Sequence, residues 1–373
     1  MPQVIFFGHD AHDAAVQRRI ASFVRAGAAL IGATMRRGAA IETPWDNIDL
    51  GETRDADFAQ RLAALARGRT ILARHKALLA AADIFYARNL DMLLLATQAK
   101  SMSSARAKIV YECLDIHRFM TREDPLGAAM RGLERRLLKA SERVIISSPA
   151  FEREYFAKRH PGAYRALLVE NRIAPGFTYG PRPAPHARGE GPLTIGWFGN
   201  LRCKRSLSLL LALAERFPER VRLSLRGAPA KAEFADFEAR VAGRANVCFG
   251  GRYRWPDDLA ALYRDVDLVW AGDFHDAGAN SKWLLPNRLY EGGYYGAPPF
   301  APADSETGRW IEAHGFGFTL AEPLEETLPA FTEALTPERL SEARARLAAA
   351  SDSVFLQDES EIPNLIEAIM SGR

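Results

Sequence analysis

The stretch "IAPGFTYGPRPAPHARGEGPL" (Ile173–Leu193) determines how the chain is divided. It is rich in proline and glycine and poor in apolar residues, which is typical of a linker. On each side of it, short apolar runs alternate with longer runs whose apolar residues recur at helical spacing. Such alternation predicts parallel sheets covered by helices on both faces. The sequence therefore predicts an α/β protein with two Rossmann-like doubly wound domains that face a central cleft.

The domain boundaries follow from where this alternation starts and stops. At roughly 100–200 residues per domain, a chain of 373 residues suits two domains. We expect one Rossmann-like domain over residues 1–173, a linker over 174–192 and a second Rossmann-like domain over 193–350. A C-terminal helix is expected over 351–373, and packing back on the first domain is one arrangement open to it.

The predicted strands are the short apolar runs. In the first half they cover residues 3–8, 28–37, 84–88, 108–115, 143–148 and 166–172. In the second half they cover residues 193–199, 221–227, 246–251, 267–272 and 297–302. Ligands of doubly wound folds bind at the carboxyl ends of the strands, so we expect the functional residues in the loops that follow them.

Cysteine usage and hydropathy predict the compartment. Cys113, Cys203 and Cys248 lie far apart and in no metal-binding spacing, which is typical of free thiols in a reducing compartment. The chain passes from its first residues directly into a strand, without the basic and apolar regions of a signal peptide. No apolar run approaches the roughly 20 residues that span a bilayer. We therefore expect a cytoplasmic protein.

The loop "GWFGNLRCKRS" (Gly196–Ser206) has the features of a phosphate site. Gly199 permits a tight turn and Ser206 is a candidate cap for the next helix, whose first N–H groups would face a phosphate. Arg202 and Lys204 add positive charge. We expect a diphosphate here, although a solvated turn with surface basic residues is the alternative. The pattern is not G-x-G-x-x-G, so a dinucleotide is a weak interpretation.

The stretch "PNRLYEGGYYG" (Pro286–Gly296) places a lone acid, Glu291, in what we predict to be the first turn of a helix. The helix dipole would favour a carboxylate there. Alternatively, Glu291 accepts hydrogen bonds from the two vicinal hydroxyls of a ribose, because an ionised carboxylate only accepts. Gly292 and Gly293 would then allow a ligand or a neighbouring backbone to approach closely.

With these motifs the second half resembles the nucleotide-sugar-binding domain of GT-B glycosyltransferases, especially family 4-like bacterial enzymes. The matching stretches are Gly196–Ser206, Asn246–Trp270 and Pro286–Ala301. The first half resembles the acceptor domain of exopolysaccharide glycosyltransferases, through Gly8–Arg37 and "VYECLDIH" (Val110–His117). The resemblance implies a hexosyltransferase that uses a nucleotide-diphosphate sugar as donor and needs no metal or other cofactor.

The resemblance also suggests the donor site. It implies that Glu291 holds the ribose, and that the loop after the strand at 246–251 faces the base, unless its aromatic residues pack beneath it. Family 4 enzymes usually carry a second glutamate eight positions earlier, where this chain has Trp283. The sugar would then meet the region 273–282 instead. The candidate donor-binding residues are Gly199, Asn200, Arg202, Lys204, Arg252, Tyr253, Lys282, Asn287 and Glu291.

An acceptor site is expected in the first half, at "GHDAHDAA" (Gly8–Ala15) and "ECLDIHR" (Glu112–Arg118). An inverting transferase needs a carboxylate or histidine there as the base for an acceptor hydroxyl. A retaining transferase, the alternative, needs mainly to hold the sugar and to stabilise the departing diphosphate. The expected acceptor is a glycan or a polyprenyl-diphosphate-linked glycan, with no nucleic-acid partner. The candidate catalytic residues are Asp115 and His117, then Asp10 and Asp13.

The stretch Leu126–Arg143 predicts a basic amphipathic helix with an apolar stripe at Leu126, Met130, Leu133 and Leu137. It could contact the inner face of an anionic membrane, or it could pack on the sheet like an ordinary helix. Two other functions stay open at this stage. They are a GT-B-type sugar-nucleotide epimerase and a catalytically degenerate nucleotide-binding protein, which the substitution at Trp283 would suit.

Overall fold

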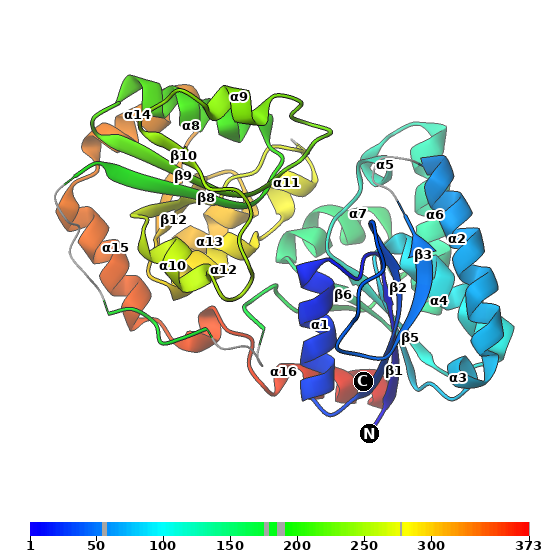
Figure 1. Cartoon of the computed structure of the whole chain (residues 1–373). Coiled ribbons are helices and arrows are strands. Elements are labelled where there is room, and N and C mark those ends of the chain that lie inside the picture. Colours follow the sequence, from blue (N-terminus) through cyan, green and yellow to red (C-terminus); the bar gives the residue numbers. More distant parts are fainter. Residues whose placement is uncertain (54–57, 175–178, 185–190, 277, 373) are drawn as a thin grey trace. The chain divides into compact units, whose positions relative to one another are not determined.

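The computed structural model describes residues 1–53, 58–174, 179–184, 191–276 and 278–372. The chain forms two compact α/β units (Figure 1). The first consists of Met1–Glu170, Ala174–Gly176 and Asp358–Arg373, and the second of Asn171–Ile173 and Phe177–Gln357.

The first unit is built on a parallel sheet of order β3-β2-β1-β4-β5-β6-β7. Every predicted strand is present, but β3 was missed. This strand alternates polar residues with the buried Ile48 and Leu50, so it lacks the continuous apolar run of its neighbours. The strands are β1 (Gln3–Gly8), β2 (Ala29–Arg36), β3 (Asn47–Glu52), β4 (Ile84–Arg88), β5 (Lys108–Cys113), β6 (Arg143–Ile146) and β7 (Ala166–Leu168).

Helices cover both faces of this sheet (Figure 1). One face carries α1 and α16, whose Ile20, Phe23, Leu365 and Ile369 share a core cluster with β1 and β4. The other face carries α2, α4 and α6. The α-helices of this unit are α1 (Ala14–Arg25), α2 (Phe58–Leu72), α3 (Lys76–Ala80), α4 (Leu90–Ser103), α5 (Arg118–Thr121), α6 (Pro125–Ala140), α7 (Ala157–Arg159) and α16 (Glu361–Ser371).

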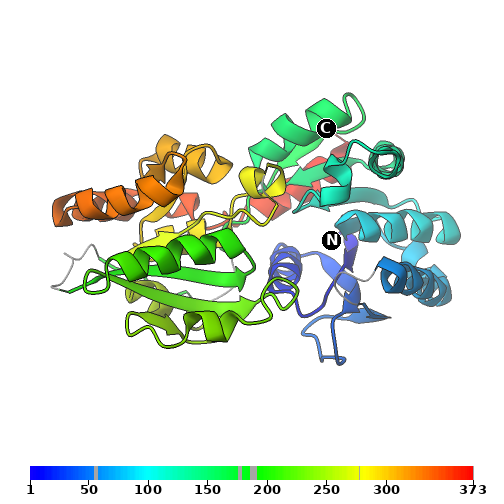
Figure 2. The same cartoon turned by 90° about the horizontal axis from the view of Figure 1, so that it is seen from above.

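The second unit repeats the architecture with a parallel sheet of order β10-β9-β8-β11-β12-β13. Seen from above, α8 lies across β8 and β9 (Figure 2). The edge strand β13 was not predicted, because it has only three residues, which follow the glycine-containing turn at 315–317, and only Leu320 among them is buried. The strands are β8 (Leu193–Leu201), β9 (Val221–Pro229), β10 (Val247–Phe249), β11 (Leu268–Trp270), β12 (Pro299–Pro302) and β13 (Phe318–Leu320).

The helices of the second unit also lie on both faces of its sheet, with α8, α9 and α14 on one side and α10, α12 and α13 on the other (Figure 1). Their bounds, with those of two further helices, are α8 (Lys204–Arg216), α9 (Phe237–Val241), α10 (Leu259–Arg264), α11 (Asn280–Trp283), α12 (Asn287–Tyr294), α13 (Glu306–His314), α14 (Leu324–Ala334) and α15 (Pro337–Ala349).

The basic helix α6 differs from its predicted pattern. Leu137 is buried, but Leu126 is 47% exposed, and the acidic Glu134 is buried in the face that packs on the unit. Glu134 accepts hydrogen bonds from Tyr155 Oη and pairs with His160 Nε2 at 2.7 Å. The predicted stripe is therefore only partly the packed face. Within the described residues, no helix combines the length and the apolar character needed to span a bilayer.

Candidate active site

The predicted phosphate loop is shorter than expected, because β8 continues through Gly199 and Asn200 to Leu201. Helix α8 then begins at Lys204 after only two residues. The cap is not Ser206, as predicted, but Cys203, whose Sγ accepts from the backbone N–H of Ser206 at 3.3 Å. Ser206 itself is buried, and its Oγ accepts from Trp270 Nε1 at 3.0 Å. Sulfur is not among the usual capping groups, so the sequence did not indicate this cap.

Gly199 and Gly227 are needed where β8 and β9 approach each other. Gly199 has a φ of 105°, in the region that favours glycine. A Cβ atom on Gly227 would lie 1.8 Å from the carbonyl oxygen of Gly199, which excludes any side chain at Gly227. The backbone conformation at these two glycines therefore fixes the end of β8 independently of any ligand.

Arg202 lies at the carboxyl end of β8 and forms an ion pair with Asp273 after β11, with Nη2 and Oδ2 3.4 Å apart. The other oxygen of Asp273 accepts from the backbone of His275 at 2.7 Å and from Ser281 Oγ at 3.0 Å. Burial opposes ionisation of Asp273, but Arg202 and the bond from His275 hold its pKa below the ordinary value. These contacts join the loop after β8 to α11, in the region expected to meet the sugar.

Lys204 and Lys282 are both exposed and each pairs with a carboxylate. Lys204 Nζ is 3.3 Å from Glu233 Oε2, and Lys282 Nζ pairs with Asp304. Exposed pairs of this kind contribute little to stability. Replacing either carboxylate partner by an anionic ligand would therefore cost little.

Arg288 is a site residue that the sequence analysis missed. It is buried, and it donates to the carbonyl oxygens of Trp270 at 2.8 Å, Phe198 at 3.3 Å and Gly272 at 3.1 Å. Burial lowers the pKa of Arg288 from its ordinary value. Its guanidinium ties the carboxyl ends of β8 and β11 together. In the sequence, Arg288 is next to the donor candidate Asn287, which is half-buried and is the first residue of α12.

Glu291 is not in the first turn of its helix. Helix α12 begins at Asn287 after Pro286, so Glu291 is its fifth residue and the helix-dipole explanation is wrong. The carboxylate is only 3% exposed. Its Oε1 accepts from Trp255 Nε1 at 3.2 Å, and its Oε2 accepts from the hydroxyl of Tyr263 at 3.0 Å.

The two glycines after Glu291 serve packing inside the unit. A Cβ on Gly292 would lie 2.7 Å from Val269 Cγ1, and one on Gly293 would lie 2.3 Å from the ring of Phe355. Of the two predicted roles, close approach of a ligand or of a neighbouring part of the chain, the contacts show the second. The glycines let α12 lie directly against β11 and against the segment that contains Phe355.

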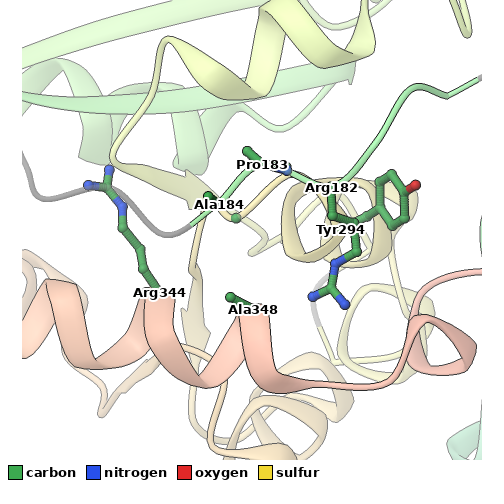
Figure 3. Close-up of a pocket in the computed structure, with 7 residues that line it drawn as sticks. Arg182, Pro183, Ala184, Tyr294, Arg344 and Ala348 are labelled. Carbon is green, nitrogen blue, oxygen red and sulfur yellow. The ribbon is translucent and has the colours of Figure 1, made fainter.

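The tyrosines that follow hold the connecting segment. The hydroxyl of Tyr294 donates to the carbonyl of Gly180 at 3.0 Å, and that of Tyr295 donates to the carbonyl of Tyr179 at 2.7 Å. A small pocket beside Tyr294 is lined by Arg182, Pro183, Ala184, Arg344 and Ala348 (Figure 3). Arg182 donates to the carbonyls of Leu347 and Ala350 at the end of α15. The pocket therefore lies where residues 182–184 pack beside α12 and α15.

The predicted base-facing loop follows β10. Arg252 is exposed, and its carbonyl accepts from Arg226 Nη2 at 3.2 Å. Tyr253 and Trp255 are partly buried against the core cluster that contains Tyr263. Aromatic packing beneath this loop, the alternative considered from the sequence, is therefore present.

In the first unit, Asp10 and Asp13 both act as local hydrogen-bond acceptors after β1. Asp10 is 5% exposed and accepts from the backbone N–H groups of His12 at 3.0 Å and Arg37 at 3.2 Å. Asp13 caps α1 through the N–H of Ala15 at 2.7 Å. Burial opposes the ionisation of Asp13, but its contact with His9 at 3.5 Å holds its pKa well below the ordinary value.

Asp115 and His117 follow β5 and are exposed. His117 caps the short helix α5, with its Nδ1 accepting from the backbone of Phe119 at 3.3 Å. The carbonyl of Asp115 accepts from Cys113 Sγ at 3.7 Å. Among the described residues, no group of three or more His, Cys, Asp or Glu side chains is arranged to hold a metal ion.

Comparison with known proteins identifies the family. The chain is 38% identical over 377 residues to the succinoglycan biosynthesis protein ExoL of Rhizobium meliloti (strain 1021), covering 99% of this chain and 93% of that protein. The chain belongs to the ExoL family. No general family model matches it.

Solved structures show that this ExoL-family chain has the GT-B fold. Anabaena HepE in complex with UDP and glucose superposes with a TM-score of 0.74 at 16% identity, and sucrose-phosphate synthase from Thermosynechococcus elongatus with 0.77 at 13%. Both alignments cover 100% of each chain. The predicted resemblance to GT-B exopolysaccharide glycosyltransferases and the two Rossmann-like domains are confirmed.

The ExoL-family chain carries a buried polar cluster at Glu112, where the sequence predicted that the loops after β1 and β5 meet but did not predict the partners Arg19 and Arg88. Glu112 is 1% exposed, with Oε1 2.9 Å from Arg19 Nε and Oε2 2.7 Å from Arg88 Nε. Next to Arg88, Asn89 has a φ of 74°, and its Nδ2 lies 3.3 Å from His9 Nδ1. Residues that are far apart in sequence meet at the carboxyl ends of β1, β4 and β5. The residues around Glu112 in the sequence do not indicate that Arg19 and Arg88 pair with it.

Proposed function

We propose that this chain is a glycosyltransferase that moves a sugar from a nucleotide-diphosphate sugar to a glycan or polyprenyl-diphosphate-linked glycan in exopolysaccharide synthesis. Its membership of the ExoL family and its GT-B fold support the reaction class. The observation that carries the donor assignment is the buried carboxylate of Glu291 on α12, which accepts hydrogen bonds from Trp255 and Tyr263. HepE, which shares the fold, binds UDP, UDP-glucose and glucose.

In this proposal the donor lies along the carboxyl ends of β8, β10 and β11. Glu291 accepts from the ribose hydroxyls, because each oxygen of a carboxylate can accept more than one hydrogen bond. Arg202 and Lys204 meet the diphosphate beside the N-terminus of α8, where the helix dipole also favours an anion. Arg252 and Tyr253 face the base.

The remaining donor residues lie around the sugar and the turn of β8. Lys282 extends from α11 toward a sugar hydroxyl or the diphosphate, since its amine is exposed and paired only at the surface with Asp304. Gly199, Asn200 and Asn287 shape the site through the backbone and one amide. No metal is required if Arg202 and the lysines balance the charge of the departing diphosphate.

Asp115 is the proposed base for the acceptor hydroxyl, with His117 beside it. Both are exposed at the carboxyl end of β5, so an acceptor can reach them. Asp10 and Asp13 are weaker candidates. Each already accepts backbone hydrogen bonds, and the lowered pKa of Asp13 makes this carboxylate a poor acceptor of a proton.

The proposed location is the cytoplasm, with peripheral contact to the inner face of the membrane. Helix α6 exposes Leu126, Arg136 and Lys139 on its surface. An apolar side chain among basic ones suits an anionic lipid surface. Such a contact would bring the active site to a lipid-linked acceptor.

A donor screen tests the proposed function. UDP-, GDP- and ADP-sugars are compared by thermal shift, and turnover of the donors that bind is then followed with and without acceptor, in the presence of EDTA. Acceptor-dependent release of nucleotide is expected. Epimerised or hydrolysed donor without acceptor would favour the epimerase, and binding without turnover the degenerate protein, although the comparisons favour neither.

A further inference from the structure

We infer that Trp255 and Tyr263 are positioning residues for Glu291, and that together they set how strongly the site selects a nucleotide with a ribose diol. This inference rests on the proposed function, because it assigns the ribose to Glu291. It adds two residues that neither contact the diphosphate nor belong to the sequence motif around Glu291.

The two side chains reach the carboxylate from different elements. Trp255 belongs to the loop between β10 and α10, and Tyr263 belongs to α10 itself. The indole N–H meets one carboxylate oxygen at 3.2 Å and the phenol hydroxyl meets the other at 3.0 Å. Each oxygen of Glu291 therefore has its own donor.

This arrangement fixes the rotation of the carboxylate. A glutamate side chain has three rotatable bonds, and its freedom must be lost before its oxygens can face a diol. Donors on both oxygens remove that freedom in advance, so less is lost when the nucleotide binds. The same bonds also set the directions in which each oxygen accepts a further hydrogen bond.

Tyr263 is itself rigidly held. It is 1% exposed, with its ring edge-on to Phe198 at 5.2 Å and stacked on Tyr295 at 6.0 Å. Burial raises its pKa well above the ordinary value, and the nearby Glu291 raises it further. Tyr263 therefore stays a neutral donor at any pH at which the enzyme works.

Trp255 links the carboxylate to the loop after β10. It is only partly buried, and it lies two residues after Tyr253 and three after Arg252, the candidates for the base. The hydrogen bond to Glu291 makes the position of this loop depend on the carboxylate. Contacts to the base and to the ribose should therefore be coupled through Trp255.

The test compares two ligands across four variants. Trp255→Phe and Tyr263→Phe each remove one donor and keep an aromatic ring, and the double variant removes both. Tyr294→Phe is the matched control, since it removes a buried hydroxyl from α12 whose partner is the carbonyl of Gly180. Binding of UDP and of 2′,3′-dideoxy-UDP is measured by calorimetry for each protein.

Each single variant should bind UDP about three- to tenfold more weakly, because a carboxylate that has lost one donor gives up more rotational freedom when the diol binds. Dideoxy-UDP, which has no diol, should bind them as it binds the wild type, and this binding also shows that the variants are folded. The control should keep the wild-type ratio of the two affinities.

The outcomes separate this inference from the proposed function. If the wild type prefers UDP over dideoxy-UDP but the Trp255 and Tyr263 variants keep that preference, or lose both ligands equally, the two residues are only structural and the inference is overturned. If the wild type binds UDP and dideoxy-UDP equally, or binds neither them nor GDP and ADP, Glu291 has no ribose role and the donor assignment falls with it.

Discussion

Replacing Glu291 with glutamine separates the stability of the second unit from its affinity for a ribonucleotide. Glutamine keeps the shape of the side chain. Its oxygen can accept from Trp255 Nε1, while its amide N–H can donate to the oxygen of Tyr263, whose hydroxyl hydrogen is free to turn away. Both hydrogen bonds survive, although they become neutral ones.

The expected change in the free energy of unfolding follows from this rearrangement. Each bond changes from charge-assisted to neutral, a loss of about 1 kcal/mol per bond, but the buried carboxylate no longer has to be kept from water. The two effects oppose each other, so we expect the free energy of unfolding to change by no more than about 1 kcal/mol, or roughly 2–4 °C in melting temperature. Glu291→Ala, in contrast, removes the acceptor of the partly buried Trp255 N–H and of the buried Tyr263 hydroxyl, and the loss at Tyr263 alone should cost about 1–3 kcal/mol.

The affinity for UDP, unlike the free energy of unfolding, should fall clearly. With the amide committed to Tyr263, one ribose hydroxyl loses a charged acceptor, worth about 1.5–3 kcal/mol, and UDP should bind Glu291→Gln about ten- to a hundredfold more weakly. Thermal unfolding and calorimetry measure the two quantities. Glu306→Gln is the control, because Glu306 is also buried in this unit and pairs with Arg309 at 2.9 Å. A large loss of stability with unchanged UDP affinity would refute the reasoning.

Three further outcomes follow from contacts described above. Arg202→Ala should weaken binding of a nucleoside diphosphate by about 1.5–3 kcal/mol and leave the nucleoside unaffected, as calorimetry can show; equal losses would remove Arg202 from the diphosphate site. Gly293→Ala should lower the free energy of unfolding by about 1–3 kcal/mol, because its Cβ would meet the Phe355 ring at 2.3 Å, and Gly293→Ala combined with Phe355→Leu should recover part of that loss in the same thermal measurement. Burial opposes ionisation of Glu112, but its two arginine partners hold its pKa below the ordinary 4.5, so its contribution to stability is complete above that pH and is lost as the pH falls below it; Glu112→Gln should flatten this part of the stability profile, and an unchanged acid limb would contradict the assignment.

The sequence predicted the central strands well, because strands buried on both faces are continuous apolar runs. It did not predict β3 and β13. These lie at sheet edges, where one face meets solvent and the apolar run is short or interrupted. The order of strands in each sheet depends on pairings between distant segments, and single-strand patterns do not contain that information.

The local geometry around the candidate site differs from the prediction. Glu291 was predicted to lie in the first turn of its helix, but α12 begins directly after Pro286, four residues before Glu291. The reason for Gly293 is Phe355, more than sixty positions further along the chain, and no local pattern shows that contact. Arg288 was missed because its partners are backbone carbonyls of three separate segments.

The placement of α16 has a consequence for how the protein is made. Its Ile362, Leu365, Ile366 and Ile369 complete the core cluster of the first unit, although 188 positions separate Glu170 from Asp358 (358 − 170). At about 5–20 residues per second, the ribosome needs roughly 10–40 s to reach α16 after finishing the rest of that unit. Throughout this interval the second unit is being translated, while apolar side chains on α1 and β1 lack their cover. The first unit to be translated is thus the last to be completed.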